Sequence, residues 1–183
     1  AIGKVVFDNA EMLAREAVDE TRMGVYEDKV AKNRGKSKGV WYDLKGKQSM
    51  GIVSVDPVTD LITILKPVGV VAAITPTTNP IVTPMSKTMF ALKGKNAIIV
   101  APHPRSKKCS SHTVALINEA IAKFGVPQNL VQCIEEPSIE LTQELMRSVD
   151  VVLATGGMPM VKSAYSSGKP SYGVGAGNVQ VII

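Results

Sequence analysis

The sequence predicts an α/β protein built on a parallel sheet, and three observations predict this fold class. Short apolar runs at 68–74, 96–101 and 150–155 alternate with amphipathic helical stretches. Each run ends at a proline, glycine or polar turn. The 183 residues are 45% hydrophobic, as expected for strands that are buried on both faces. Because ligands bind at the carboxyl ends of parallel strands, the loops after these runs are the candidate functional positions.

Two helical regions and a hairpin are predicted before the alternating region. Asp8–Glu11 resembles a capping box, and apolar residues from Ala10 to Val18 follow at helical spacing, with Gly24 as a stop. The basic segment 29–47 is interrupted by glycines, which predicts a short helix and loops. Two β-rich runs, Gly51–Val55 and Leu61–Leu65, predict a hairpin. Because a lone hairpin is marginal in water, it should pack on the main domain or on a second subunit.

The alternating region predicts strands at 68–74, 96–101, 130–134, 151–154 and 179–183. The four connections between them should each hold a helix: near 84–92, near 106–124, after Ser138 and near 159–166. Val114, Ile117, Ile121 and Phe124 should share one face of the helix at about 106–124, and Ser138 should cap the next helix. An apolar strand at the end of a chain suits the interior of a sheet. We therefore expect the natural protein to continue beyond Ile183.

Composition excludes several classes of protein. No apolar run approaches the length of a membrane span, and no signal-peptide pattern is present. Two cysteines make no disulfide framework, so the expected location is the cytoplasm. The net charge of +5 reflects basic residues at 29–47 and 105–108, for which nucleic-acid binding is one interpretation. Only Trp41 and Tyr42 offer stacking groups nearby, so a solvated surface is the favoured interpretation.

Two of the loops could bind an anion. Gly156-Gly157 follows a strand and opens a helix, which is typical either of phosphate binding or of a tight turn. His103, Arg105, Lys107 and Lys108 follow the second strand, where cations oppose the helix dipole, and this favours an anion site over ordinary surface charge. The glycines at 173–177 precede a strand, which is the wrong orientation for phosphate capture.

Reactive groups are few, and no metal-ligand pattern appears. Cys109 lies near a helix N-terminus beside lysines and one turn before His112, so a lowered thiol pKa and a nucleophilic role are one hypothesis. No third orienting group is evident for it. Cys133 lies within a strand and should pack. The polar turn at Thr77–Asn79 could donate to an oxyanion or could simply be a turn.

Five segments, in order, resemble the CoA-acylating aldehyde dehydrogenases: Pro76–Pro80, Ala101–Arg105, Ala154–Gly157, Ala164–Pro170 and Gly173–Asn178. Residues 14–20 and 24–32 resemble the succinate-semialdehyde branch, with the acetaldehyde branch as the alternative. The resemblance implies the Rossmann-like sheet of the aldehyde dehydrogenase superfamily, in truncated form. It implies NAD or NADP as cofactor, coenzyme A as cosubstrate, a small aldehyde or acyl-CoA substrate and a homo-oligomer, in the cytoplasm or in a bacterial microcompartment.

The resemblance also implies roles for individual residues. The oxyanion donor is Thr78 by an ungapped match or Asn79 by chemistry, and Asn79 is preferred. Gly173 occupies the position of the glutamate general base of the hydrolytic enzymes, and Pro102 and Arg105 replace a lysine and a glutamate that hold the ribose. The implied cofactor-binding residues are Thr75, Pro76, Thr77, Pro102, His103, Pro104, Arg105, Thr155, Gly156, Gly157, Val174 and Gly175.

The family's nucleophilic cysteine lies beyond the end of this sequence, and neither Cys109 nor Cys133 matches it. This segment alone should therefore bind nucleotide without turnover. The expected division is 1–50 for N-terminal helices and a basic loop, 51–65 for an oligomerisation hairpin and 66–183 for an incomplete NAD(P)/CoA-binding domain. The competing hypotheses are a stand-alone nucleotide-binding module, a thiol enzyme built on Cys109 and a nucleic-acid binder.

Overall fold

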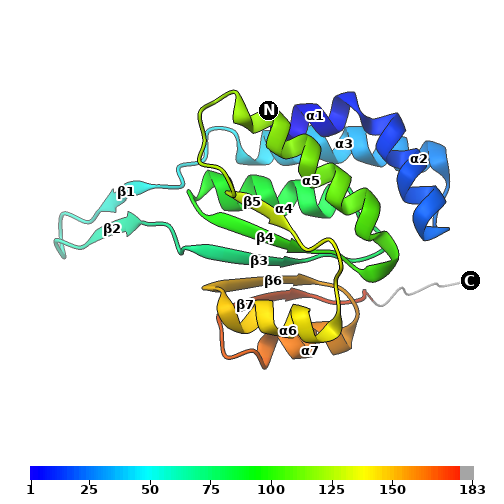
Figure 1. The fold of residues 1–183 in the computed structure, drawn as a ribbon. Coiled ribbons are helices and arrows are strands. Elements are labelled where there is room, and N and C mark those ends of the chain that lie inside the picture. Colours follow the sequence, from blue (N-terminus) through cyan, green and yellow to red (C-terminus); the bar gives the residue numbers. More distant parts are fainter. Residues whose placement is uncertain (178–183) are drawn as a thin grey trace, which may run out of the picture.

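A five-stranded sheet forms the centre of the computed structural model, which describes residues 1–177 (Figure 1). Its order is β5 (Val131–Cys133), β4 (Ala97–Ala101), β3 (Val70–Ile74), β6 (Val151–Thr155) and β7 (Ser171–Val174). Every neighbouring pair is parallel. The chain runs outward from β3 to β5 and then crosses to β6 on the other side of β3. This reversal is a topological switch point, and the predicted parallel α/β sheet is confirmed.

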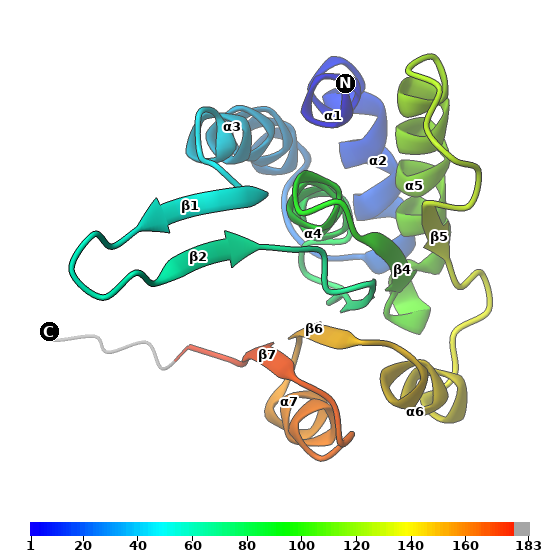
Figure 2. The same ribbon diagram turned by 90° about the vertical axis from the view of Figure 1, so that its left-hand side faces the viewer.

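Helices cover both faces of the sheet (Figures 1 and 2). On one face lie α4 (Val82–Lys93) and α5 (Lys107–Ala122), and on the other α6 (Ile139–Ser148) and α7 (Met158–Tyr165). Successive residues of β3 point to opposite faces. Val71 and Ala73 therefore join the core under α5, whereas Ala72 and Ile74 join the core under α6 and α7.

The N-terminal helices form an outer layer over α4 and α5. These are α1 (Ile2–Asp8), α2 (Ala10–Thr21) and α3 (Tyr26–Leu44). Val6 and Leu13 lie in one buried cluster with Met85 of α4 and Ile117 of α5. This layer therefore shares a core with the helices of the sheet domain.

Two sequence predictions fail in this layer. Helix α1 was not predicted, and α2 begins at Ala10 without any side-chain cap, so the capping box at Asp8 does not form. The basic segment is one continuous helix, α3, rather than a short helix and loops. Val30, Asn33 and Ser37 form a buried stripe along α3, and Asn33 Nδ2 donates to the carbonyl of Ala10 at 3.1 Å. Packing of this stripe offsets the helix-weakening glycines.

The hairpin is confirmed as β1 (Gly51–Val55) paired antiparallel with β2 (Ile62–Leu65). It extends away from the body of the molecule (Figure 1). Its large apolar side chains are mostly more than half exposed, with Val58 at 90%. The most exposed are Ile52, Val55, Val58, Leu61 and Ile62.

Strand β7 was missed by sequence, because its four residues contain one glycine and only one β-branched residue. Its extended state comes from pairing with β6. Phe124 is also misassigned, because α5 ends at Ala122 and the ring is 65% exposed. The predicted strand at 179–183 lies outside the described residues. Within residues 1–177, no helix has the length and apolar character needed to cross a membrane.

A tight joint closes the amino end of the sheet where the chain enters β3. Gly69 has a φ of +119°, and the Asp150 carboxylate accepts the Val70 N–H at 2.7 Å. Asn96 Oδ1 accepts the N–H groups of Val68 and Gly69 at 2.6 and 3.0 Å. Three loops are therefore joined behind the strands, at the end opposite to their carboxyl termini.

Candidate functional site

A cleft of about 630 Å³ lies at the carboxyl ends of β3, β4, β6 and β7, at the switch point of the sheet. The loops after three of the predicted strands meet there, together with the end of β7. The oxyanion candidates and the cofactor-binding residues implied by the resemblance all line it: Thr75, Pro76, Thr77, Thr78, Asn79, Pro102, His103, Pro104, Arg105, Thr155, Gly156, Gly157, Val174 and Gly175.

Sequence reasoning missed several residues of the cleft wall. Ser138 was predicted only as a helix cap, which is confirmed because its Oγ accepts the Leu141 N–H at 3.0 Å. It also lines the cleft with Ile139 and with Thr142 on the same helix. Met23 reaches the cleft from the loop after α2. No local sequence signal marks Met23, because only the tertiary fold brings it to the strand ends.

The Gly156-Gly157 turn does not need glycine for its own backbone. Gly157 has a φ of −67°, and an added Cβ at either glycine would meet no atom closer than 3.5 Å. No side chain caps α7, which begins directly after Gly157. Small residues beside uncapped helix amides allow a ligand to approach closely. These facts favour phosphate binding over the alternative of a tight turn.

Thr75 supplies a polar group without a partner on the floor of the cleft. The residue is 2% exposed, and its Oγ1 has no hydrogen-bond partner among residues 1–177. A buried hydroxyl of this kind usually has a partner, since leaving it unpaired costs about 1–3 kcal/mol. Because this oxygen is itself closed off from solvent, a ligand in the cleft could pair with it only after the Thr75 side chain rotates.

His103 and Arg105 form the polar rim after β4. His103 Nδ1 accepts the Arg105 N–H at 3.1 Å. Burial and the Arg105 guanidinium both lower the pKa of His103, so the ring is neutral at pH 7 with its proton on Nε2. Arg105 is exposed, and one of its amino groups donates to the Thr21 carbonyl at 3.1 Å. Both side chains can therefore act as donors to an anion.

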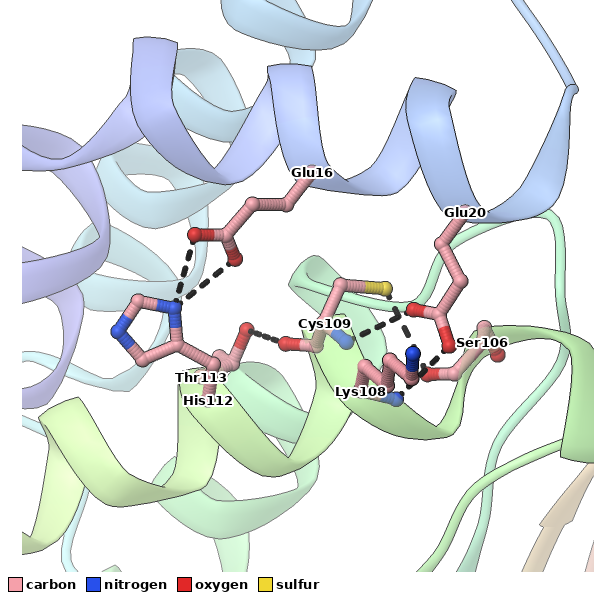
Figure 3. Close-up of polar contacts among 7 residues, drawn as sticks. All are labelled: Glu16, Glu20, Ser106, Lys108, Cys109, His112 and Thr113. Carbon is pink, nitrogen blue, oxygen red and sulfur yellow. Dashed lines mark hydrogen bonds and ion pairs between the residues drawn. The ribbon is translucent and has the colours of Figure 1, made fainter.

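Lys107 and Lys108 do not share that rim, which corrects part of the predicted anion cluster. Lys107 pairs with Glu136. The carboxylate of Glu20, from α2, accepts the N–H groups of Lys108 and Cys109 at 2.9 and 2.8 Å (Figure 3). The anion at the start of α5 is thus an internal carboxylate. It escaped prediction because Glu20 lies far from α5 in the sequence.

The environment of Cys109 contradicts the nucleophile hypothesis (Figure 3). The thiol is 2% exposed, and burial together with Glu20 raises its pKa well above the ordinary value. His112 binds the Glu16 carboxylate at 2.9 Å. The neighbouring carboxylates outweigh the lysines that sequence suggested as activators. Cys133 is half-buried in β5, and burial raises its pKa as well.

Asn79 is held by α3. Its Oδ1 accepts a hydrogen bond from Lys32 Nζ at 3.1 Å, and Lys29 Nζ donates to the Thr78 carbonyl at 3.0 Å. Burial and the charge of Lys32 lower the pKa of Lys29. With its oxygen engaged, Asn79 keeps its NH₂ group as donor, and one N–H remains free beside the long 3.4 Å contact to Thr78 Oγ1. This orientation suits an oxyanion donor and was not visible in the sequence, where the basic segment had no assigned partner.

Lys87 ties the two strands at the switch point together. Its Nζ donates to the carbonyls of Ile74 in β3 and Leu153 in β6, at 2.7 and 2.6 Å. Burial lowers the pKa of Lys87 to about 7, while the two carbonyls act in the opposite direction by stabilising the ammonium form. Among the described residues, no group of His, Cys, Asp and Glu side chains is arranged to hold a metal ion.

We expect the stability of the protein to depend on pH through Lys87. In the unfolded chain this amine titrates near 10.4, so between about pH 7 and 10 the unfolded state binds more protons. The free energy of unfolding should therefore rise with pH across that window, by up to about 1.4 kcal/mol per pH unit. In Lys87→Met this rise should be lost, as urea titrations at pH 7.5 and 9.5 would measure. Lys38→Met, on the exposed side of α3, is the control. Parallel pH curves for wild type and Lys87→Met would contradict the assignment.

The model of the aldehyde dehydrogenase family matches residues 6–173. The chain belongs to the aldehyde dehydrogenase family. It is 59% identical over 183 residues to succinate-semialdehyde dehydrogenase (acetylating) of Clostridium kluyveri, covering 100% of the chain and 40% of that relative. It is 53% identical over 185 residues to sulfoacetaldehyde dehydrogenase of Acholeplasma sp, covering 100% of the chain and 38% of the relative. It thus spans well under half of the aldehyde dehydrogenases that it matches.

Solved aldehyde dehydrogenases share the fold. An acetylating aldehyde dehydrogenase from Geobacillus thermoglucosidasius gives a TM-score of 0.93 at 42% identity over 97% of this chain and 40% of that one. A Rhodopseudomonas palustris propionaldehyde dehydrogenase with bound CoA and an acylated cysteine gives 0.79 at 36% identity, with 97% and 40% covered. An engineered glycolyl-CoA reductase with bound NADP⁺ gives 0.80 at 36% identity, with the same coverage.

Gly173 has no room for the glutamate that the resemblance places there in hydrolytic aldehyde dehydrogenases. A Cβ at this position would lie 2.6 Å from Val161 Cγ1 and 3.1 Å from the Tyr165 ring. The Gly173 N–H donates to the Tyr165 hydroxyl at 3.2 Å. A carboxylate at residue 173 would therefore require the Val161 and Tyr165 side chains of α7 to shift.

Proposed function

We propose that this chain is the cofactor-binding part of a CoA-acylating aldehyde dehydrogenase. The reaction converts an aldehyde, CoA and NAD(P)⁺ into an acyl-CoA, NAD(P)H and a proton. The observation that carries the proposal is the meeting of the 75–79, 102–105 and 155–157 loops in one cleft at the switch point. Relatives with bound CoA and with bound NADP⁺ support it.

The residues of the cleft fit a dinucleotide. Gly156 and Gly157 let a phosphate approach the amides of α7, and Thr75 offers a buried hydroxyl. Arg105 and the Nε2–H of His103 serve the ribose phosphate of NADP or CoA. When bound, NAD(P)⁺ accepts the hydride of the aldehyde. Without a carboxylate at Gly173 to activate water, CoA can compete for the acyl group.

Asn79 is the proposed oxyanion donor. Its NH₂ group faces away from Lys32 and can donate to the aldehyde oxygen as negative charge develops there. The thiol that forms the acyl intermediate would come from a part of the protein outside this chain, because Cys109 is buried with a raised pKa. The role of this chain is then to hold the cofactor and to polarise the carbonyl.

Succinate semialdehyde is the proposed aldehyde, because the 59% identical relative is named for it, and the acetaldehyde branch is the alternative. We propose that residues 66–183 form the NAD(P)/CoA-binding unit, with 1–50 as its helical layer. The hairpin at 51–65 would join subunits of a homo-oligomer, a role supported by its exposed apolar side chains. The free thiols of Cys109 and Cys133 support a reducing cytoplasm as the location.

Arg105→Glu should weaken NADP⁺ more than NAD⁺ in the full-length enzyme. A carboxylate beside the 2′-phosphate replaces an attraction by a repulsion, so we expect about a 10- to 100-fold rise in the NADP⁺ dissociation constant and a much smaller change for NAD⁺. Titrations with NAD⁺, NADP⁺ and CoA measure this, and Lys162→Glu on α7 is a matched control outside the cleft lining. Equal losses of affinity for NAD⁺ and NADP⁺ would show that Arg105 does not bind the ribose phosphate. Failure of the wild type to bind any of the three would refute the proposed function.

A further inference from the structure

A second hollow of about 340 Å³ adjoins the cleft between α3 and α4. Asn79 lines both spaces, so they meet at the proposed oxyanion donor. One wall is a stripe on α3, and the other is the first turn and a half of α4. The remaining lining residues are Lys32, Lys36, Val40, Val82, Thr83 and Ser86.

The hollow is positively charged. Lys32 and Lys36 lie one helical turn apart on the same side of α3. Among residues 1–177 neither forms an ion pair, whereas Arg34, on the same helix, pairs with Glu11 at 2.7 Å. The twelve-residue helix α4 begins at Val82 in the wall, so the positive end of its dipole adds to the two ammonium groups. The Thr83 hydroxyl offers a further donor, whereas the Ser86 hydroxyl donates to the Thr83 carbonyl at 3.1 Å.

The dimensions fit a short aldehyde with a charged tail. Lys32 contacts Asn79 directly, and Lys36 is attached about 6 Å further along α3. The carbonyl and carboxylate carbons of a four-carbon semialdehyde are separated by two methylenes, or about 4 Å at bond lengths near 1.5 Å. Val40 and Val82 provide apolar wall for those methylenes.

We infer that this hollow is the subsite for the distal anion of the aldehyde, with Lys36 as a specificity-determining residue. The inference rests on the proposed function and specifies the substrate class of the enzyme. These substrates are aldehydes that carry a carboxylate or a sulfonate a few bonds from the carbonyl. Two relatives named for such aldehydes, succinate semialdehyde and sulfoacetaldehyde, support it. Lys32 has a double role, because it orients Asn79 and faces the anion.

The test compares two four-carbon aldehydes in the full-length enzyme, with CoA and NAD(P)⁺ saturating. For Lys36→Met, kcat/KM for succinate semialdehyde should fall by about 10- to 100-fold, mainly through KM, because one charge-assisted contact is lost. For neutral butanal it should stay within about twofold, because butanal makes no such contact. Lys36→Arg should retain most of the preference. Lys38→Met is the matched control, since Lys38 lies on the same helix with its ammonium over the Phe7 ring, outside the hollow.

Other outcomes would overturn the inference. If Lys36→Met lowers kcat/KM equally for succinate semialdehyde and butanal, or lowers it for neither, Lys36 does not recognise the distal anion. A raised KM for CoA with an unchanged KM for the aldehyde would assign the hollow to a CoA phosphate instead. These results leave the proposed function standing as long as the wild type oxidises butanal in a CoA-dependent manner. If no aldehyde supports CoA-dependent reduction of NAD(P)⁺, the proposed function itself fails.

Discussion

Asn79→Ala should lower kcat of the full-length enzyme by about 10²- to 10³-fold, the usual cost of removing one oxyanion donor. The amide oxygen of Asn79 accepts a hydrogen bond from Lys32 Nζ at 3.1 Å, which leaves the NH₂ group to act as the proposed donor. The hydrogen bond from the Asn79 NH₂ group to the aldehyde oxygen should strengthen as negative charge develops on that oxygen. Its loss should therefore lower kcat and leave KM little changed. Steady-state kinetics with succinate semialdehyde, CoA and NAD(P)⁺ provide the measurement.

Thr78→Ala separates the two candidates for this role. Thr78 is exposed beside Asn79, and its Oγ1 accepts from Asn79 Nδ2 at 3.4 Å. Its loss should cost less than about 10-fold, because the contact is long and only helps to orient the amide. If Thr78→Ala costs more than Asn79→Ala, the ungapped match is right and Thr78 is the donor. Equal melting temperatures for the two variants would show that the difference in kcat does not arise from a loss of stability.

Gly69→Ala should destabilise the fold by about 2–4 kcal/mol, since backbone strain and steric overlap add. The φ of +119° is unfavourable for any residue with a Cβ. That Cβ would also lie 2.1 Å from Asp150 Oδ2 and 2.8 Å from its Cγ. Asp150 cannot retreat without giving up its hydrogen bond to the Val70 N–H. Urea unfolding of the two proteins measures the difference.

Gly35→Ala is the matched control for Gly69→Ala. Gly35 lies within α3, and an added Cβ there would meet nothing within 4 Å. Alanine should therefore stabilise this helix by about 0.5–1 kcal/mol. Opposite signs for the two substitutions are expected. A Gly69→Ala protein as stable as the wild type would mean that the joint at the amino end of β3 can relax.

The sheet and the cleft were accessible from sequence because both rest on local patterns. Apolar runs such as 96–101 predict buried strands, and the loops after parallel strands must meet at one edge. For this reason, the sequence alone predicts that His103 and Gly157 belong to one site, and both line the cleft. The resemblance added the residues at Val174 and Gly175, which local patterns had set aside.

The remaining features depend on contacts between distant segments. Helix α3 forms because Val30 and Asn33 are buried against other helices, although its glycines disfavour it locally. The Glu20 carboxylate takes the place at the start of α5 that sequence assigned to a ligand. Lys32 reaches Asn79 from the segment expected to form a short helix and loops. Local propensity carries no information about such pairings.

The projecting hairpin has a practical consequence for handling the protein. An exposed two-stranded ribbon with Val58 at 90% exposure presents unpaired strand edges together with apolar surface. Such edges template the addition of further strands, so an excised segment is prone to precipitate through this ribbon before its core unfolds. A lysine in place of Val55, which is 58% exposed in β1, would act as a gatekeeper and keep the material in solution.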